Sequence, residues 1–169
     1  GNPVYDSREG CNAIIETTTN TLIKGCKTTV IPEGVTEIVS EAFYGCTSLK
    51  SIIIPESVTK IGNWAFSRCT SLESITIPDS VTEIGDDAFR GCTSLESIVV
   101  ADGNPVYDSR EGCNAIIETT TNTLIQGCKT TVIPESVTEI GYSAFGCCTS
   151  PESVTIPEGV TKIEVCTFE

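Results

Sequence analysis

Cysteine is the residue type in this chain with the most potential chemistry, because there are ten cysteines and no histidine. Four of them, Cys46, Cys69, Cys92 and Cys148, each follow a phenylalanine by three residues. Each repeat contributes one thiol at this position and no Cys-x-x-Cys pair occurs, so a zinc knuckle cannot form. We therefore expect these four thiols to be buried and to pack as small apolar side chains, with no metal site.

Other catalytic groups are scarce. The absence of histidine removes the usual nucleophilic triads and most metal hydrolase sites. Adjacent carboxylates such as Asp86 and Asp87 could act as acid and base, but they lie at the start of an expected helical turn with no implied pocket. No glycine-rich phosphate loop is present. We expect a chain that is not an enzyme and binds no cofactor.

The charge balance limits the kinds of partner. The chain has 23 acidic and 10 basic residues, which gives a formal net charge of −13. A nucleic-acid face needs clustered Lys and Arg, and an anionic membrane surface also attracts basic segments. We therefore expect neither nucleic acid nor membrane insertion, and no run of 18 apolar residues suggests a membrane span.

The elements that position these residues repeat with a period of 23 residues. The marker Ile-Pro recurs at this spacing, and Val100-Ala101 keeps the phase without the proline. Its copies are Ile31-Pro32, Ile54-Pro55, Ile77-Pro78, Ile133-Pro134 and Ile156-Pro157. A fixed period of this length is typical of a solenoid, in which no coil buries its apolar side alone.

Residues 72–94 illustrate the pattern expected within a coil. Alternation predicts a strand with Leu72, Ile75 and Ile77 inward, which Pro78 ends because proline lacks an N–H. A short second strand follows at 81–84, and residues 86–90 are expected to form one helical turn. Phe89 should then point into the core. In consecutive coils this places Phe43, Phe66 and Phe89 in one internal column.

The sequence also contains a second, longer repeat in addition to the 23-residue period. Residues 1–38 recur at 103–140, with differences only at Lys24/Gln126 and Gly34/Ser136. Each copy holds an insertion expected to form a hairpin, with strands at 11–16 and 21–26. With a turn at Thr18-Thr19, Cys11 faces Cys26, and Cys113 faces Cys128 in the second copy. These two pairs are the candidate disulfides, although a loop with Asn20 left-handed would shift the pairing by one residue.

We therefore expect a single array over residues 1–169. Its parts are a long inserted coil at 1–30, three short coils at 31–99, a second long inserted coil at 100–132, and short coils at 133–169 that are cut off at the C-terminal end. The expected fold is a mainly β solenoid of 23-residue coils, each with strand, turn, short strand and helical turn.

The recurring motif Ala-Phe-x-x-Cys-Thr-Ser-Leu-x-Ser-Ile-x-Ile-Pro-x-Ser-Val-Thr-x-Ile-Gly resembles the BspA-type, or Treponema-type, leucine-rich repeat. Residues 2–7, Asn-Pro-Val-Tyr-Asp-Ser, resemble an insertion found between such repeats. The resemblance implies a bacterial extracellular or cell-surface protein whose usual role is adhesion to host or microbial proteins. It also implies no catalysis and no cofactor, and it carries no fixed functional residues.

The expected interaction surface is the sheet face whose side chains point outward. The residues that the strand register places there are Lys50, Ser51, Ile53, Glu73, Ser74, Thr76, Glu96, Ser97, Val99, Glu152, Ser153 and Thr155. Val30 and Val132 occupy the Thr76 position in the inserted coils. Trp64 replaces polar residues of other coils and is a further candidate anchor. The alternative is that this face is only solvated and the array is a structural spacer.

Overall fold

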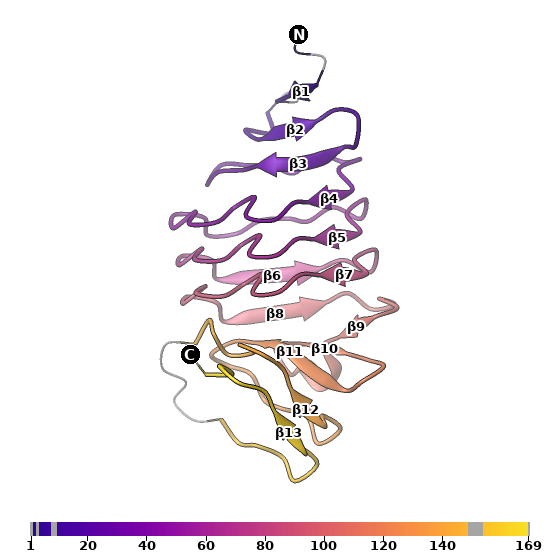
Figure 1. Cartoon of the computed structure of the whole chain (residues 1–169), viewed down its shortest axis with the longest axis vertical. Helices are drawn as coiled ribbons and strands as arrows, with labels where there is room; N and C mark the ends of the chain where they lie inside the picture. Colours follow the sequence, from indigo (N-terminus) through magenta and orange to yellow (C-terminus); the bar gives the residue numbers. More distant parts are fainter. Residues whose placement is uncertain (1, 3, 8–9, 149–153, 169) are drawn as a thin grey trace.

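Successive turns of the chain lie on one another along the long axis, from β1 near one end to β13 near the other (Figure 1). The computed structural model describes residues 2, 4–7, 10–148 and 154–168. Its strands are short. They are β1 (Tyr5–Asp6), β2 (Ile14–Glu16), β3 (Thr21–Lys24), β4 (Glu37–Ile38), β5 (Lys60–Ile61), β6 (Ser74–Ile77), β7 (Glu83–Ile84), β8 (Ser97–Val100), β9 (Tyr107–Asp108), β10 (Ala115–Glu118), β11 (Thr123–Gly127), β12 (Glu139–Ile140) and β13 (Lys162–Ile163).

The strands form three sheets that run along the array. The first has the order β1-β2-β3-β4-β5-β7, the second β13-β12-β11-β10-β9, and β6 pairs with β8 alone. Between coils the pairing is parallel, and the register joins Ile38 to Ile61 and Ile61 to Ile84. A shift of 23 residues therefore equals a step of one strand, as the sequence period predicts.

Threonine hydroxyls form additional hydrogen bonds between neighbouring coils. Thr59 Oγ1 donates to the carbonyl of Thr36 at 3.2 Å, and Thr82 Oγ1 donates to the carbonyl of Thr59 at 3.5 Å. Thr161 repeats the contact with Thr138 at 3.3 Å. Threonine recurs at this position because its side chain can pair with the backbone of the neighbouring coil while it stays at the surface.

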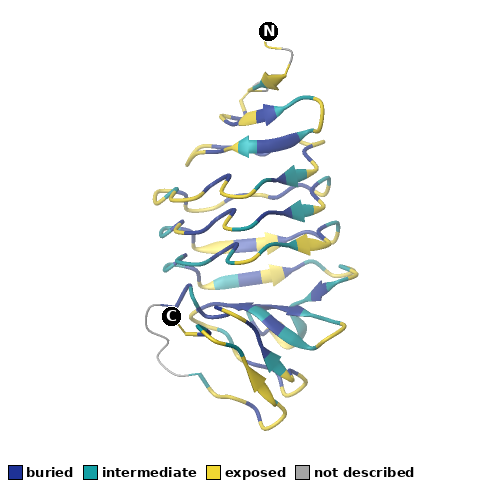
Figure 2. Ribbon diagram, viewed as in Figure 1, coloured by how far each residue is buried: buried dark blue, intermediate teal, exposed yellow. Residues whose placement is uncertain are grey.

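The core is a continuous column of aromatic and aliphatic side chains. Phe43, Phe66, Phe89 and Phe145 are fully buried. The inward positions Leu72, Ile75 and Ile77 are also buried, as the L-x-x-I-x-I spacing predicts. Buried positions recur in each coil, and exposed positions occur both at the turns and on the outward side of several strands (Figure 2). The prediction of one shared core is confirmed.

The predicted helical turn is wrong. In the described residues the only helical segment is a 3-10 turn at Arg110–Gly112. Residues 86–90 instead form linked turns, with φ +54° at Asp87. The residues at this position in other coils also have positive φ, and they are Glu41, Trp64, Ser143 and Cys166.

Hydrogen bonding between coils explains this difference. The amides of Trp64, Phe66 and Arg68 donate to carbonyls of the next coil, at residues 86, 88 and 90, over 2.7–2.9 Å. A helical turn would direct these N–H groups along its own axis. Because these N–H groups donate to carbonyls of the neighbouring coil, the backbone conformation alternates along the segment, and the segment cannot be a helix.

The inserted hairpins have a register that changes along their length. β2 pairs with β3 through Glu16↔Thr21 and Ile15↔Leu22, which is the predicted register. A bulge then shifts the pairing to Ile14↔Lys24, and Asn20 is left-handed with φ +55°. Both features that the sequence offered as alternatives are therefore present in different parts of the same hairpin.

The bulge separates the cysteines predicted to form disulfides. All ten cysteines, which lie within the described residues, are free thiols, so Cys11–Cys26 and Cys113–Cys128 are not bonded. Beyond the equivalent bulge, Ala115 pairs with Gly127, and a one-residue shift sends neighbouring side chains to different faces. Cys113 Sγ then contacts the Ala115 carbonyl at 3.9 Å and Cys128 Sγ the Asn114 carbonyl at 3.4 Å.

Candidate interaction surface

The predicted interaction residues within the described part of the chain lie at the surface. The exposed ones are Lys50, Ser51, Ile53, Glu73, Ser74, Thr76, Glu96, Val99, Thr155 and Trp64, and Ser97 is half-buried. Glu152 and Ser153 lie outside the described residues. Among the described residues of this face, β6 and β8 are the only regular strands.

An aliphatic stripe runs along this face, one residue per coil. Ile53 is 85% exposed, Val132 is 72% exposed and Val30 is 65% exposed. Val99 is exposed as well, and it pairs directly with Thr76 between β8 and β6. We call Val30, Ile53, Thr76, Val99, Val132 and Thr155 the aliphatic stripe, although two members are threonines. Side chains alternate in a strand, so these positions point outward because their neighbours fill the core.

A shallow groove of about 510 Å³ borders the stripe at its first two coils. Val30 and Ile53 line it together with Pro32 and Pro55, and Glu33 adds one carboxylate. Most of this wall is apolar. Such a surface suits an aliphatic or aromatic side chain of a protein partner better than it suits a charged ligand.

A column of charges runs beside the stripe and changes sign along the array. It contains Lys27 and Lys50 in the first coils, then Glu73 and Glu96, and all four are exposed. The coils are joined here by the amide of Glu73, which donates to the Lys50 carbonyl at 3.1 Å. A partner placed along the stripe would therefore meet basic side chains at one end and acidic ones at the middle.

Trp64 belongs to a different depression, of about 670 Å³, among the turns. Its indole Nε1 donates to Asp87 Oδ2 at 3.2 Å, and Asp87 Oδ2 also lies 3.6 Å from an Arg90 nitrogen. The Arg68 guanidinium lies over the Tyr44 ring, 5.6 Å from its centroid. The residues lining this depression and the groove beside Ile53 do not overlap.

Arg68 is a residue that sequence reasoning missed. It has φ +60° at the position where neighbouring coils have Gly45 at +71° and Gly91 at +73°. A side chain in this conformation is uncommon, so the departure from glycine was a signal in the repeat alignment. Together with Tyr44 and Trp64, Arg68 forms a small aromatic and cationic patch on the turns.

The four cysteines that follow phenylalanine occupy the interior, as predicted, with Cys46 only half-buried. Cys69 Sγ donates to the Phe43 carbonyl at 3.2 Å and Cys92 Sγ to the Phe66 carbonyl at 3.1 Å. A hydrogen bond with Cys69 and burial both raise the pKa of the Cys92 thiol. The thiols of Cys69 and Cys92 therefore donate hydrogen bonds across neighbouring coils. Within the described residues no group of Cys, Asp and Glu could hold a metal ion.

The repeating coils of this chain match a known repeat family. The chain matches the BspA type leucine rich repeat region, in six copies, over residues 19–123 and 123–169. The chain is a BspA-type leucine-rich repeat protein. Its BspA-type repeats thus span nearly all of the described coils. No curated protein matches the chain.

Solved structures of bacterial proteins share this BspA-type solenoid. A leucine rich cell surface protein from Faecalibacterium prausnitzii A2-165 is 34% identical with a TM-score of 0.66, over 79% of this chain and 36% of that chain. The pneumococcal vaccine antigen PcpA is 24% identical with a TM-score of 0.61, over 83% of this chain and 42% of its own, which shows the fold alone. The BspA-type chain therefore matches less than half the length of either relative.

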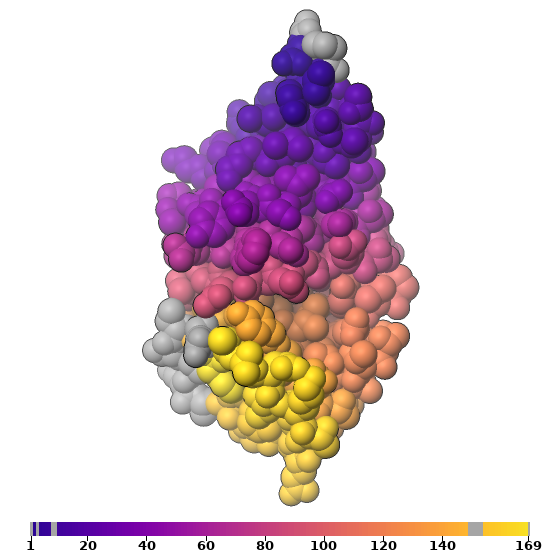
Figure 3. All heavy atoms as spheres, viewed as in Figure 1, coloured from indigo at the N-terminus to yellow at the C-terminus, as the bar shows by residue number. Residues whose placement is uncertain are grey.

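The molecule is elongated. On the face shown in Figure 3 successive coils lie side by side and appear as successive bands of colour. A partner that covers more than one band contacts several coils at once. Among the described residues, no helix has the length and apolar character needed to cross a membrane. The BspA-type array thus offers two surfaces of distinct chemistry, the aliphatic stripe and the patch around Trp64.

Proposed function

We propose that the chain is a non-catalytic interaction module of a bacterial cell-surface protein, and that it binds an extracellular protein through the aliphatic stripe. The observation that carries this proposal is the exposure of Val30, Ile53 and Val132, which occupy the same position in three different coils. Exposed aliphatic side chains that form a continuous surface mark contact sites more often than isolated ones do.

The shape of the surface supports a protein partner. Specific protein interfaces bury about 800 Å² on each side, an area that needs several adjacent coils. The stripe, with hydroxyl side chains such as Ser51 and Ser74 beside it, resembles an apolar centre with a polar rim. Aromatic side chains do not line this stripe, so a carbohydrate ligand fits it poorly.

The likeness to a cell-surface protein of Faecalibacterium prausnitzii supports an extracellular location. A host or microbial surface protein is then the kind of partner that the stripe would meet. The net charge of −13 favours partners without strong negative charge.

The test is binding to a panel of purified extracellular proteins, followed by stripe variants. Ile53→Glu and Val132→Glu should weaken binding to the identified partner at least about tenfold, because each buries a charge in an apolar contact. Val165→Glu is the matched control, since Val165 is 68% exposed but lies among the turns. Equal binding by all three variants would contradict the proposal.

A structural spacer is the second candidate function. The phenylalanine column and the threonine contacts recur in coil after coil, irrespective of what the outward face carries. Such a stack is stiff enough to hold another domain at a distance. If function survives the stripe variants but changes when whole coils are removed, the spacer role is correct.

A further inference from the structure

The depression beside Trp64 is formed by large side chains in three neighbouring coils. Tyr44, Trp64, Arg68 and Arg90 line this hollow of about 670 Å³, which we call the turn depression. At the Trp64 position other coils have an acidic residue or serine, and at the Arg68 position two coils have glycine. The repeat itself therefore does not explain these four side chains, which occur together at one place on the array.

The register of the coils arranges these side chains around a small central residue. The Gly45 amide donates to the Ser67 carbonyl at 2.9 Å, and the Arg68 amide donates to the Arg90 carbonyl at 2.7 Å. Tyr44 and Arg90 therefore occupy the Ser67 position in the coils before and after it, about 10 Å apart at the usual strand spacing. Ser67 is 3% exposed, so it forms the floor between two longer side chains.

The exposure of the turn depression does not depend on where the chain begins or ends. On one side the Gly25 amide of the first hairpin donates to the Ala42 carbonyl at 2.9 Å. On the other side the Gly91 amide donates to the Gly146 carbonyl at 3.0 Å. Coils are thus stacked on both sides of the depression, and a further coil at either end of the array would lie beyond them.

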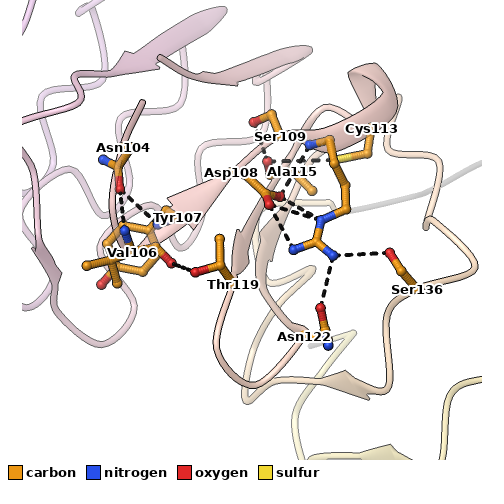
Figure 4. A network of polar contacts seen from close by, with 11 residues as sticks. Asn104, Val106, Tyr107, Asp108, Ser109, Cys113, Ala115, Thr119, Asn122 and Ser136 are labelled. Atoms are coloured by element: carbon orange, nitrogen blue, oxygen red, sulfur yellow. Dashed lines mark hydrogen bonds and ion pairs between the residues drawn. The ribbon is translucent and has the colours of Figure 1, made fainter. Parts of the chain in front are cut away.

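The Arg68 guanidinium has hydrogen-bond donors that no residue of the described chain uses. It lies over the Tyr44 ring, 5.6 Å from the centroid, and makes no hydrogen bond or ion pair with the described residues. A cation–π contact requires no N–H donation. The Arg110 guanidinium, by contrast, pairs with Asp108 at 2.8 Å and donates to Asn122 at 2.9 Å (Figure 4). Arg68 therefore has donors left for a ligand.

The charge of the turn depression differs from that of the whole chain, whose formal net charge is −13. Arg68 and Arg90 supply two guanidiniums, and Glu41 adds one exposed carboxylate. The Asp87 side chain is only 7% exposed, and its Oδ2 faces Arg90 at 3.6 Å and accepts from Trp64 Nε1 at 3.2 Å. Because the Asp87 charge is buried against these partners, the accessible groups favour an anionic ligand.

Two aromatic rings add flat apolar surface beside the guanidiniums. Trp64 is 41% exposed and Tyr44 is 39% exposed. The C–H groups of a sugar ring carry partial positive charge, so they pack well on the negative face of an aromatic ring. Hydroxyl groups both donate and accept, so the Glu41 carboxylate can accept from one sugar hydroxyl. These groups together fit a sugar that carries negative charge.

An acidic peptide fits the turn depression less well. A peptide main chain binds most readily where a strand edge offers open hydrogen-bonding groups. The amides of Trp64, Phe66 and Arg68 already donate to the next coil, and the Ser67 carbonyl accepts from the Gly45 amide. The backbone at the floor is therefore occupied, and a ligand has only side chains to bind.

We propose that the turn depression binds a sugar ring that bears a carboxylate or sulfate group. The anionic group pairs with the Arg68 guanidinium, because arginine holds such oxyanions through two N–H groups. The ring packs on the exposed face of Trp64. This site shares no lining residue with the groove beside Ile53, so it is independent of the aliphatic stripe.

Fluorescence titration of the 1–169 chain tests the proposal, because Trp64 is the only tryptophan. The probes are sialyllactose, which carries a carboxylate, sulfated lactose, and lactose itself as the neutral core. Either or both charged probes should give a saturable change below about 10 mM. Lactose should bind at least about tenfold more weakly, because it cannot pair with a guanidinium. The tighter of the two charged probes identifies the preferred anion.

Arg68→Gly tests the ion pair without risk to the fold. Glycine is the residue at this position in Gly45 and Gly91, and the φ of +60° at Arg68 suits it. The variant should bind the charged probes at least about tenfold more weakly and lose the preference over lactose. Lys162→Gln is the control. It also removes one positive charge, but on β13 and outside the lining of the depression, so binding should stay as it is.

Trp64→Ser tests the contact with the sugar ring, and serine is the residue that another coil has there as Ser143. Saturation-transfer NMR replaces fluorescence for this variant. Transfer to the ring protons of the charged probe that binds the unchanged chain more tightly should be largely lost.

Three results would overturn the proposal. One is the absence of a saturable change with both charged probes. Another is equal affinity of Arg68→Gly and the unchanged chain for the charged probes. The last is binding of an acetylated tri-glutamate peptide as tight as that of the charged sugars, since that result means that charge alone is recognised.

Discussion

The rings of Phe43 and Phe66 lie parallel, with centroids 5.0 Å apart and planes 9° apart. Phe66 stacks in turn on Phe89 at 5.6 Å and 2°. These spacings are close to the distance of about 4.8 Å between neighbouring strands, so each coil adds one ring to the column. Phe66 therefore has an aromatic neighbour on both sides, and its contribution to stability depends on two other coils.

Phe66→Ala should lower the free energy of unfolding by about 3–5 kcal/mol. The substitution leaves a cavity in the middle of the column, because the rings of Phe43 and Phe89 are held by their own coils. Urea unfolding followed by circular dichroism measures the loss. Phe168→Ala is the control. Phe168 stacks on Phe145 but is 48% exposed, so a loss as large as that of Phe66→Ala would show that burial does not set the contribution of a ring to stability.

Gly25→Ala should destabilise the first hairpin by about 1–3 kcal/mol. A Cβ at Gly25 would lie 2.1 Å from Cε1 of Phe43, so the aromatic column would have to move. Gly45→Asn is the matched control, because Gly45 has no atom within 4 Å of its added Cβ and its φ of +71° suits asparagine. Thermal unfolding of the two variants should differ clearly. Equal melting temperatures would show that Phe43 can move aside without cost.

The free energy of unfolding should increase as the pH falls toward 4.5. The groups responsible are the carboxylates that directly follow the Ile-Pro pairs, Glu33, Glu56 and Asp79. A hydrogen bond with Asp79, desolvation and the charges of Asp79 and Glu33 raise the pKa of Glu56 above its ordinary value of 4.5. The folded state therefore takes up a proton at a higher pH than the unfolded state does. The resulting stabilisation is absent at neutral pH, appears as pH falls through the folded pKa, and is complete below 4.5.

Melting temperatures at several pH values between 7 and 4 measure this effect. Asp79→Asn removes the neighbouring charge and should reduce the gain on acidification. Glu73→Gln, a change on the outward sheet face, is the control and should leave the gain as it is. A pH profile that Asp79→Asn does not alter would show that other groups dominate.

Cys26 should react with iodoacetamide well before Cys128, although both occur in the sequence Gly-Cys-Lys-Thr-Thr. Cys26 is exposed and Cys128 is buried. Hydrogen bonds with Thr28 and Thr29 lower the pKa of the Cys26 thiol, which increases its thiolate fraction at neutral pH. Trypsin cleaves after Lys24 but not after Gln126, so mass spectrometry distinguishes the two peptides. Similar labelling rates would show that the second copy is not docked on its neighbour.

Much of the fold could be predicted from sequence because each inward position repeats. The alternation of Leu72, Ile75 and Ile77 identified the buried side of the strand, and the same register correctly placed Ile53 at the surface. Such patterns depend only on the side-chain period of two in a strand. The predicted helical turn failed because residues 86–90 were considered as an isolated segment. Their amide partners lie 22 residues away in the chain.

The disulfide predictions failed for a related reason. A bulge between Ile116 and Ile117 shifts the hairpin by one residue, and nothing in the local sequence distinguishes the shifted register from the regular one. The exposed patch at Tyr44, Trp64 and Arg68 was anticipated only at Trp64. Arg68 lies four residues after Trp64 in the same coil, and Tyr44 of the preceding coil becomes a neighbour of Arg68 when the coils stack.

The amino-acid sequence by itself determined the family, the 23-residue step, the composition of the core and the outward positions of the sheet, because each follows from a local pattern that recurs in every coil. Only the tertiary structure decided how the second of two nearly identical 38-residue segments packs, because Tyr107 is buried there and accepts a hydrogen bond from the Ile84 amide of the preceding short coil. Burial depends on the neighbour that a surface meets, and Tyr5 and Tyr107 have the same local sequence but different neighbours.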